Sequence, residues 1–162
     1  MNPFAHLDIM GSMMILFVGF GWAKPVPVDS RLLKNPRTDM MKIAAAGPIA
    51  NLLLALVSGL LLRLLNPSEI LNESMAILIY YFTRINITLA VFNLIPVAPL
   101  DGSQIFSGYL MKHNPQLAWK IQSFGPQVLF GLILFGYMTG FSILWLIMSP
   151  FVNFFMMLFA GM

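Results

Sequence analysis

The feature that most restricts the fold of this chain is the length of its uncharged stretches. Residues 121–162 contain no charged side chain, and residues 43–62 form a second uncharged run of twenty residues. A helix rises about 1.5 Å per residue, so twenty residues extend over about 30 Å, the thickness of the hydrocarbon core of a bilayer. Both stretches are therefore long enough to cross a membrane.

The charge content leads to the same conclusion. Only 9% of the 162 residues are charged and 59% are apolar, whereas about 25% of the residues of a typical soluble domain are charged. We therefore expect an all-α polytopic membrane protein, with residues 1–162 forming a single membrane domain in the lipid bilayer. The net charge of +3 does not indicate a nucleic-acid partner, because the cations are dispersed among apolar segments and form no basic stripe.

About four apolar segments are predicted to be helical, and a short apolar tail follows Pro150. The first segment has only fifteen residues, so it either crosses the membrane at a tilt or turns back as a hairpin. The tail is too short to cross alone and is expected at the interface. The segments lie at residues 9–23, 43–62, 74–100 and 125–148, and the tail at residues 151–162.

The segment at residues 74–100 contains Arg84 near its middle and two prolines near its end. Pro96 and Pro99 are expected to end the helix, because a proline lacks an N–H group and clashes with the preceding turn. Non-helical backbone at membrane depth is tolerated only where it is buried in protein or lines a wet cavity. The broken end, which leads to Asp101, therefore predicts an internal site.

Residues 22–28 (Trp-Ala-Lys-Pro-Val-Pro-Val) predict a short extended element near the cytoplasmic face. Each proline favours an extended conformation for the residue before it. The two prolines remove the N–H donors of one edge, while Lys24, Val26 and Val28 can still donate on the other edge. The element can therefore pair along one edge only.

The basic residues predict the orientation in the membrane. Five of them lie in residues 24–42, and Lys112 and Lys120 lie in residues 101–120. Loops rich in lysine and arginine stay on the cytoplasmic side, so we expect both of these loops there. Residues 63–73, which carry one cation and two acids, are expected on the opposite side.

Four strings in this chain resemble, in order, those of the site-2 protease family of intramembrane zinc metalloproteases. The most specific is N-x-x-P-x-x-P-x-D-G, which runs here from Asn93 to Gly102. Together the strings cover most of residues 2–105; the other three are Asn2-Pro3 with His6-Leu7-Asp8, the run from Gly19 to Val28, and Gly47-Pro48-Ile49-Ala50-Asn51. The C-terminal third resembles the family only in being apolar.

The resemblance implies hydrolysis of peptide bonds in membrane-spanning substrate proteins. In that family the aspartate of the D-G motif is the third zinc ligand, which assigns this role to Asp101. Asn93 is implied as a residue that orients substrate or stabilises developing charge. Zinc held by two histidines and a carboxylate leaves a position for a water molecule, whose pKa falls toward about 7. A substrate strand added to the free edge at Lys24, Val26 and Val28 would expose its peptide bonds.

This chain departs from the family in its ligand set. The other two zinc ligands and the catalytic glutamate belong to an upstream H-E-x-x-H helix, and no such sequence is present here. We expect a shortened start to explain the difference; loss of the helix, or its supply by a partner, are the alternatives. His6 is interpreted as an interfacial or capping residue and His113 as a solvated loop residue.

Two other classes of function are compatible with the sequence. The missing H-E-x-x-H motif favours a catalytically inactive scaffold or regulator that keeps the family fold. Arg84 and the broken third segment favour a small transporter or channel subunit. For Asp101 the alternative to a metal ligand is a side chain that caps a helix expected over residues 104–112.

Overall fold

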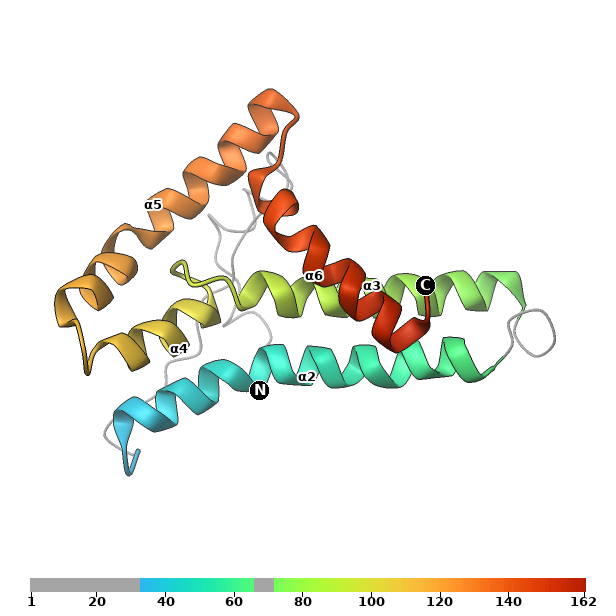
Figure 1. Ribbon diagram of the computed structural model, residues 1–162, viewed down its shortest axis with the longest axis horizontal. Helices are drawn as coiled ribbons and strands as arrows, with labels where there is room; N and C mark the ends of the chain where they lie inside the picture. Colours follow the sequence, from blue (N-terminus) through green and yellow to red (C-terminus); the bar gives the residue numbers. More distant parts are fainter. Residues whose placement is uncertain (1–32, 66–71) are drawn as a thin grey trace, which may run out of the picture. The chain divides into compact units, whose positions relative to one another are not determined.

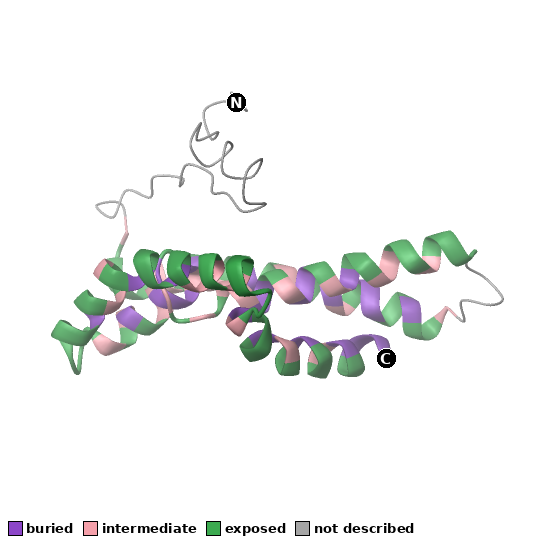
Figure 2. Ribbon diagram, turned by 90° about the horizontal axis from the view of Figure 1, so that it is seen from above, coloured by how far each residue is buried: buried purple, intermediate pink, exposed green. Residues whose placement is uncertain are grey.

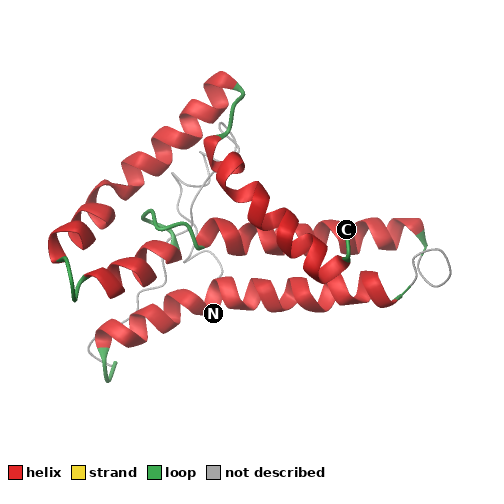
Figure 3. Cartoon of the chain, in the orientation of Figure 1, coloured by secondary structure: helices red, strands yellow, loops and turns green. Residues whose placement is uncertain are grey.

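The computed structural model describes residues 33–65 and 72–162, nearly all of which belong to one compact unit, residues 35–162. Within these ranges every regular element is a helix and no strand occurs, which confirms the all-α prediction (Figure 3). Four of the helices are long and apolar enough to cross a membrane. The elements are α2 (Pro36–Leu64), α3 (Glu73–Asn93), α4 (Asp101–Leu110), α5 (Pro115–Thr139) and α6 (Ile143–Ala160).

Helix α2 is longer than the predicted segment at residues 43–62. It begins at Pro36, a favourable first helical residue because its missing N–H needs no partner there. Pro48 lies inside the helix and is buried, and a proline at such a position removes one backbone hydrogen bond and bends the axis. Figure 1 shows α2 changing direction part way along its length.

Helix α3 ends at Asn93, before the two prolines, as their positions predict. Its N-cap is Asn72, whose side-chain oxygen accepts a hydrogen bond from the backbone N–H of Met75 at 2.8 Å. Residues 94–100 then form an irregular loop, and α4 follows at once (Figure 1). The predicted segment at residues 74–100 is therefore one spanning helix plus a loop.

The predicted boundaries of the C-terminal segments differ from those observed. The helix break lies at Gly140–Ser142, inside the predicted segment at residues 125–148. Gly140 adopts φ +70° at the end of α5, and Ser142 accepts the N–H of Trp145 at the start of α6. Pro150 does not end a helix, because neighbouring helices allow a transmembrane helix to continue through proline. The predicted interfacial tail is therefore mostly part of α6.

Helices α2, α3 and α6 pack into the main core, and α4 packs between α2 and α5. Polar side chains join α2 to α3, because the Thr83 hydroxyl donates to Ser58 Oγ at 2.8 Å and both are buried. Gly59 allows close packing with α6, since a Cβ there would lie 2.8 Å from Phe159 Cβ. Figure 2 shows that α5 carries few buried residues compared with these helices.

Two arginines bind the carbonyl groups at helix ends. The Arg37 guanidinium, at the start of α2, donates to Gly108 O at 2.6 Å and Tyr109 O at 3.2 Å, near the end of α4. The Arg63 guanidinium, at the end of α2, donates to Leu158 O at 3.4 Å, near the end of α6. The start of α2 therefore lies beside the end of α4, and the end of α2 beside the end of α6.

Several predictions concern residues outside the described ranges. These are the short segment at residues 9–23, the extended element at residues 22–28 with its free edge at Lys24, Val26 and Val28, and His6. The assignment of residues 1–162 to a single membrane domain also stays a prediction.

Candidate active site

The loop between α3 and α4 is built from successive turns. The N–H of Ile95 donates to Phe92 O at 3.1 Å, that of Val97 to Ile95 O at 2.8 Å, and that of Leu100 to Val97 O at 3.0 Å. Pro96 and Pro99 have no N–H group and occupy positions between these donors. The loop thereby pairs three of its own backbone N–H groups, and it leads directly into α4.

Asp101 is the first residue of α4, and Leu100 is its N-cap. The Asp101 side chain makes no capping hydrogen bond, so the capping interpretation was wrong in this respect, and the helix begins three residues earlier than expected. Ser103 instead donates its hydroxyl to Leu100 O at 2.7 Å. A carboxylate in the first turn also interacts favourably with the helix dipole.

The Asp101 carboxylate lies against Gly47 of α2. A Cβ built on Gly47 would lie 3.3 Å from Asp101 Oδ2, so the Gly47-Pro48 string and the D-G motif meet in space. Within the described ranges no side chain or backbone group forms a hydrogen bond or ion pair with this carboxylate. Partial burial raises the pKa of the Asp101 carboxyl.

Two further glycines allow the loop to approach its neighbours. A Cβ on Gly102 would lie 2.6 Å from Ile95 O and would also strike the Leu94 carbonyl. A Cβ on Gly125 would lie 2.5 Å from the backbone nitrogen of Ala98. The sequence identified Gly102 only as part of the D-G motif and did not single out Gly125; the repeated Gly-Pro pair, at residues 47–48 and 125–126, was the signal that could have indicated Gly125.

Asn93, the other residue assigned to the site, is the last residue of α3 and is half-buried. It lies directly before the loop, and in the described residues its side chain makes no hydrogen bond. Its role in orienting substrate stays a prediction.

The described residues do not contain a complete set of zinc ligands. The metal-ligating types among them are Asp39, Glu73, Asp101 and His113, and no three of these gather in residues 33–65 and 72–162. His113 is exposed and packs beside Tyr109, with ring centroids 5.4 Å apart. The donors of residues 33–65 and 72–162 therefore do not fit a zinc site by themselves.

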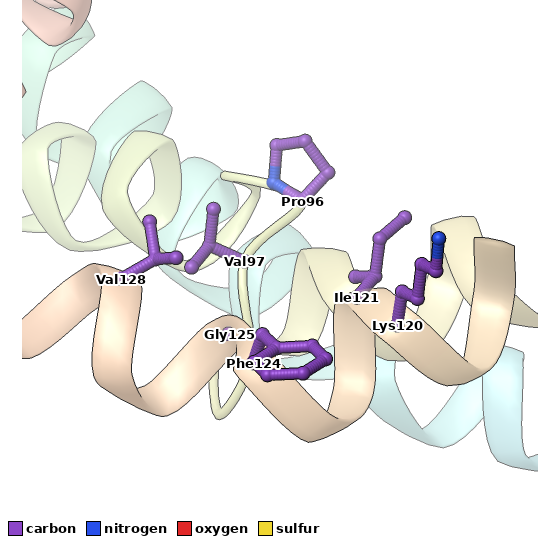
Figure 4. A pocket seen from close by; sticks show the side chains of 7 residues that line it. All are labelled: Pro96, Val97, Lys120, Ile121, Phe124, Gly125 and Val128. Atoms are coloured by element: carbon purple, nitrogen blue, oxygen red, sulfur yellow. The ribbon is translucent and has the colours of Figure 1, made fainter.

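Three cavities with mainly apolar walls lie in the described region, and Asp101 lines none of them. Pro96 lines two, one of about 230 Å³ against α5 (Figure 4) and one of about 330 Å³ against α6. The third, of about 700 Å³, is a groove between α2 and α3. The loop before Asp101 thus separates two apolar spaces.

Arg84 lies near the middle of α3 and is half-buried. Its guanidinium donates to Tyr80 Oη at 2.8 Å and lies 5.9 Å from the ring centroid of Trp145. The hydroxyl and the aromatic face partly replace water around this charge. They provide polar partners for an arginine within an otherwise apolar helix.

Comparison with known proteins identifies relatives of this chain. A family model described as peptidase family M50 matches residues 62–136, which include the D-G motif. The protein named "Putative zinc metalloprotease YwhC" of Bacillus subtilis (strain 168) is 36% identical over 150 residues, covering 90% of this chain and 68% of that protein. No solved structure matches.

Two proteins of Methanocaldococcus jannaschii are also similar. "Putative zinc metalloprotease MJ0611" is 38% identical over 97 residues, and "Zinc metalloprotease MJ0392" is 29% identical over 132 residues. The matched region covers 41% and 38% of these two proteins, respectively. This chain therefore spans less than half of their length.

Proposed function

Because this chain belongs to peptidase family M50, the site-2 protease family of membrane zinc metalloproteases, we propose that it forms the membrane core of an intramembrane protease. Its substrates are membrane-spanning proteins, whose peptide bonds it hydrolyses within or near the bilayer. The observation that carries the proposal is the position of Asp101. Its carboxylate lies against Gly47 and has no partner within the described ranges, as expected for a ligand held ready for a metal.

In this proposal Asp101 is one zinc ligand, and the remaining ligands come from outside residues 33–65 and 72–162. Asn93 orients the substrate beside the loop. The free edge at Lys24, Val26 and Val28 pairs with an unwound segment of the substrate, because a helical peptide bond has its backbone groups engaged and is poorly accessible. Residues 24–42 and 101–120 face the cytoplasm.

Zinc content tests the role of Asp101. The chain is purified alone and after co-expression with a separate membrane segment that carries an H-E-x-x-H sequence, and zinc is measured by mass spectrometry. We expect bound zinc in at least one of the two preparations, and we expect the Asp101→Ala variant of that preparation to lose it. The matched control is Asp39→Ala, which removes a carboxylate paired with Lys42 at 3.3 Å and should leave zinc unchanged.

The same preparations, in vesicles with a single-span reporter protein, test the other residues by the rate of cleavage. Asn93→Ala should slow cleavage without loss of zinc, and Val26→Pro should slow it by removing an edge donor. Zinc that persists in Asp101→Ala, or no zinc in either preparation, would overturn the proposal.

A second candidate function is a catalytically inactive scaffold or regulator of the same family. It is favoured by the ligand set, because no three metal-ligating side chains gather in the part of the chain that the structure describes. Absence of zinc from both preparations, together with stable folding, would support it.

A further inference from the structure

A cavity of about 230 Å³ lies between the loop at residues 94–100 and the first half of α5. Among the described residues that line it, Lys120 is the one charged residue, and the others are apolar: Pro96, Val97, Ile121, Phe124, Gly125 and Val128. Figure 4 shows Lys120 and Ile121 at one end and Val128 at the other. The lining is therefore cationic at one end and apolar along the rest.

The charged end of the cavity lies nearer the membrane surface than its apolar end does. Lys120 lies in the second turn of α5, and Val128 lies eight residues further along, about 12 Å deeper at 1.5 Å per residue. The α5 surface around the cavity faces outward, with Trp119, Phe124 and Val128 all exposed. A ligand here would have its charge near the membrane surface and its apolar part along the helix.

The cavity also lies at the basic end of the molecule. Arg37 joins the start of α2 to the end of α4, and Gln122 Nε2 of α5 donates to Ser107 Oγ of α4 at 2.8 Å. These contacts hold the starts of α2 and α5 against α4, so Arg37, Lys42, Lys112 and Lys120 lie at the same end of the unit. The acid within the first turns of α2, Asp39, is paired with Lys42. Anionic lipids are attracted to such a surface.

We propose that this cavity binds one anionic phospholipid. The Lys120 ammonium group receives the phosphate, and one acyl chain lies along Phe124 and Val128 against Pro96 and Val97. An amphiphile of this kind fits the single cation at the shallow end better than a wholly apolar peptide segment does. Because Pro96 and Val97 belong to the loop before Asp101, the bound lipid supports that loop on its α5 side.

The test counts lipids bound to the full chain by native mass spectrometry. The protein is extracted from vesicles containing equal amounts of phosphatidylcholine and phosphatidylglycerol. We expect one retained phosphatidylglycerol per chain, and a reduction of about fivefold in Lys120→Gln, the change given by about 1 kcal/mol for one basic side chain near a membrane. Val128→Trp, which fills the apolar end and keeps the charge, should also release the lipid.

Lys112→Gln is the matched control, because it removes the same charge from the α4–α5 turn at a residue that does not line the cavity. Retention in this variant should remain close to that of the unmodified chain. The proposal is overturned if Lys112→Gln and Lys120→Gln lose lipid equally, if Val128→Trp retains it, or if phosphatidylcholine is retained as well as phosphatidylglycerol. Cross-linking of a substrate peptide from position 124, with no retained lipid, would assign the cavity to the substrate instead.

Discussion

At the scale of single residues, three glycines determine how closely the loop before Asp101 can approach its neighbours. Gly47 faces the Asp101 carboxylate, Gly102 faces the carbonyl groups of Leu94 and Ile95, and Gly125 faces Ala98. At Gly102 and Gly125 the facing atoms include backbone, which cannot rotate away as a flexible side chain can. The glycine of the D-G motif therefore has a packing role that is separate from the chemistry of the aspartate.

Gly102→Ala is expected to destabilise the protein by about 1–3 kcal/mol, the usual cost of an overpacked methyl group. The cause is the added Cβ, which would lie 2.6 Å from Ile95 O. The free energy of unfolding in mixed micelles, measured by circular dichroism, gives the value.

The control for this change is Gly131→Ala, within α5, where a Cβ would meet nothing within 4 Å. Alanine is the better helix former by about 0.5–1 kcal/mol, so this variant should be as stable as the parent or more so. Equal stability of the two variants would contradict the packing role of Gly102.

At the scale of elements, helices α2 and α3 are joined by polar groups within an apolar surrounding. Ser58 donates to Leu54 O at 2.8 Å, and Thr83 donates to Ser58. Asn86, also buried, donates to Phe82 O at 2.8 Å within its own helix. Lipid is as apolar as leucine, so close packing and hydrogen bonds, more than apolar burial, hold membrane helices together.

A double-mutant cycle on Ser58→Ala and Thr83→Val should give a coupling free energy of about 0.6 kcal/mol, the average for hydrogen bonds between membrane helices. Unfolding in mixed micelles is the measurement. The comparison pair is Ser58→Ala with Thr139→Val, because the Thr139 hydroxyl donates to Phe135 O within α5, and these changes should add independently. Coupling near zero in the first cycle would mean that the hydrogen bond contributes nothing to the association of α2 and α3.

At the scale of the whole described unit, α2 connects two chemically different ends. Its 29 residues extend over about 43 Å, more than the hydrocarbon core. Arg37, Lys42, Lys112 and Lys120 lie at the end of the unit where α2 starts, and α6 ends beside the end of α2. Figure 1 shows the starts of α2 and α5 and the end of α4 at one end of the unit.

Because the chain contains no cysteine, single cysteines can test this orientation. We expect a membrane-impermeant maleimide to label Lys112→Cys from the cytoplasmic side and Glu73→Cys from the opposite side, since positively charged loops remain in the cytoplasm. The cysteine-free parent is the control. Labelling of both positions from the same side would contradict a crossing by α3, the spanning helix that lies between them.

The fold class and the end of α3 could be predicted because each depends on local physics. Uncharged length predicts spanning helices, and Pro96 and Pro99 predict that α3 stops. The break at Gly140–Ser142 could not be predicted in the same way, because residues 125–148 are continuously apolar and the chain contains other glycines and prolines that interrupt nothing. Pro126 and Pro150 both lie inside helices.

The sequence by itself determined that this chain is a helical membrane protein of the site-2 protease family, because composition and short motifs carry that information without knowledge of contacts. Only the tertiary structure decided that the Gly47 string and the D-G motif meet, that Asp101 does not cap its helix, and that Arg37 and Lys42 of α2 lie at the same end of the unit as Lys112 and Lys120. These features depend on residues far apart in the chain. The absence of a Cβ at Gly47, for example, matters only because Asp101 Oδ2 lies 3.3 Å from the position that a Cβ would occupy.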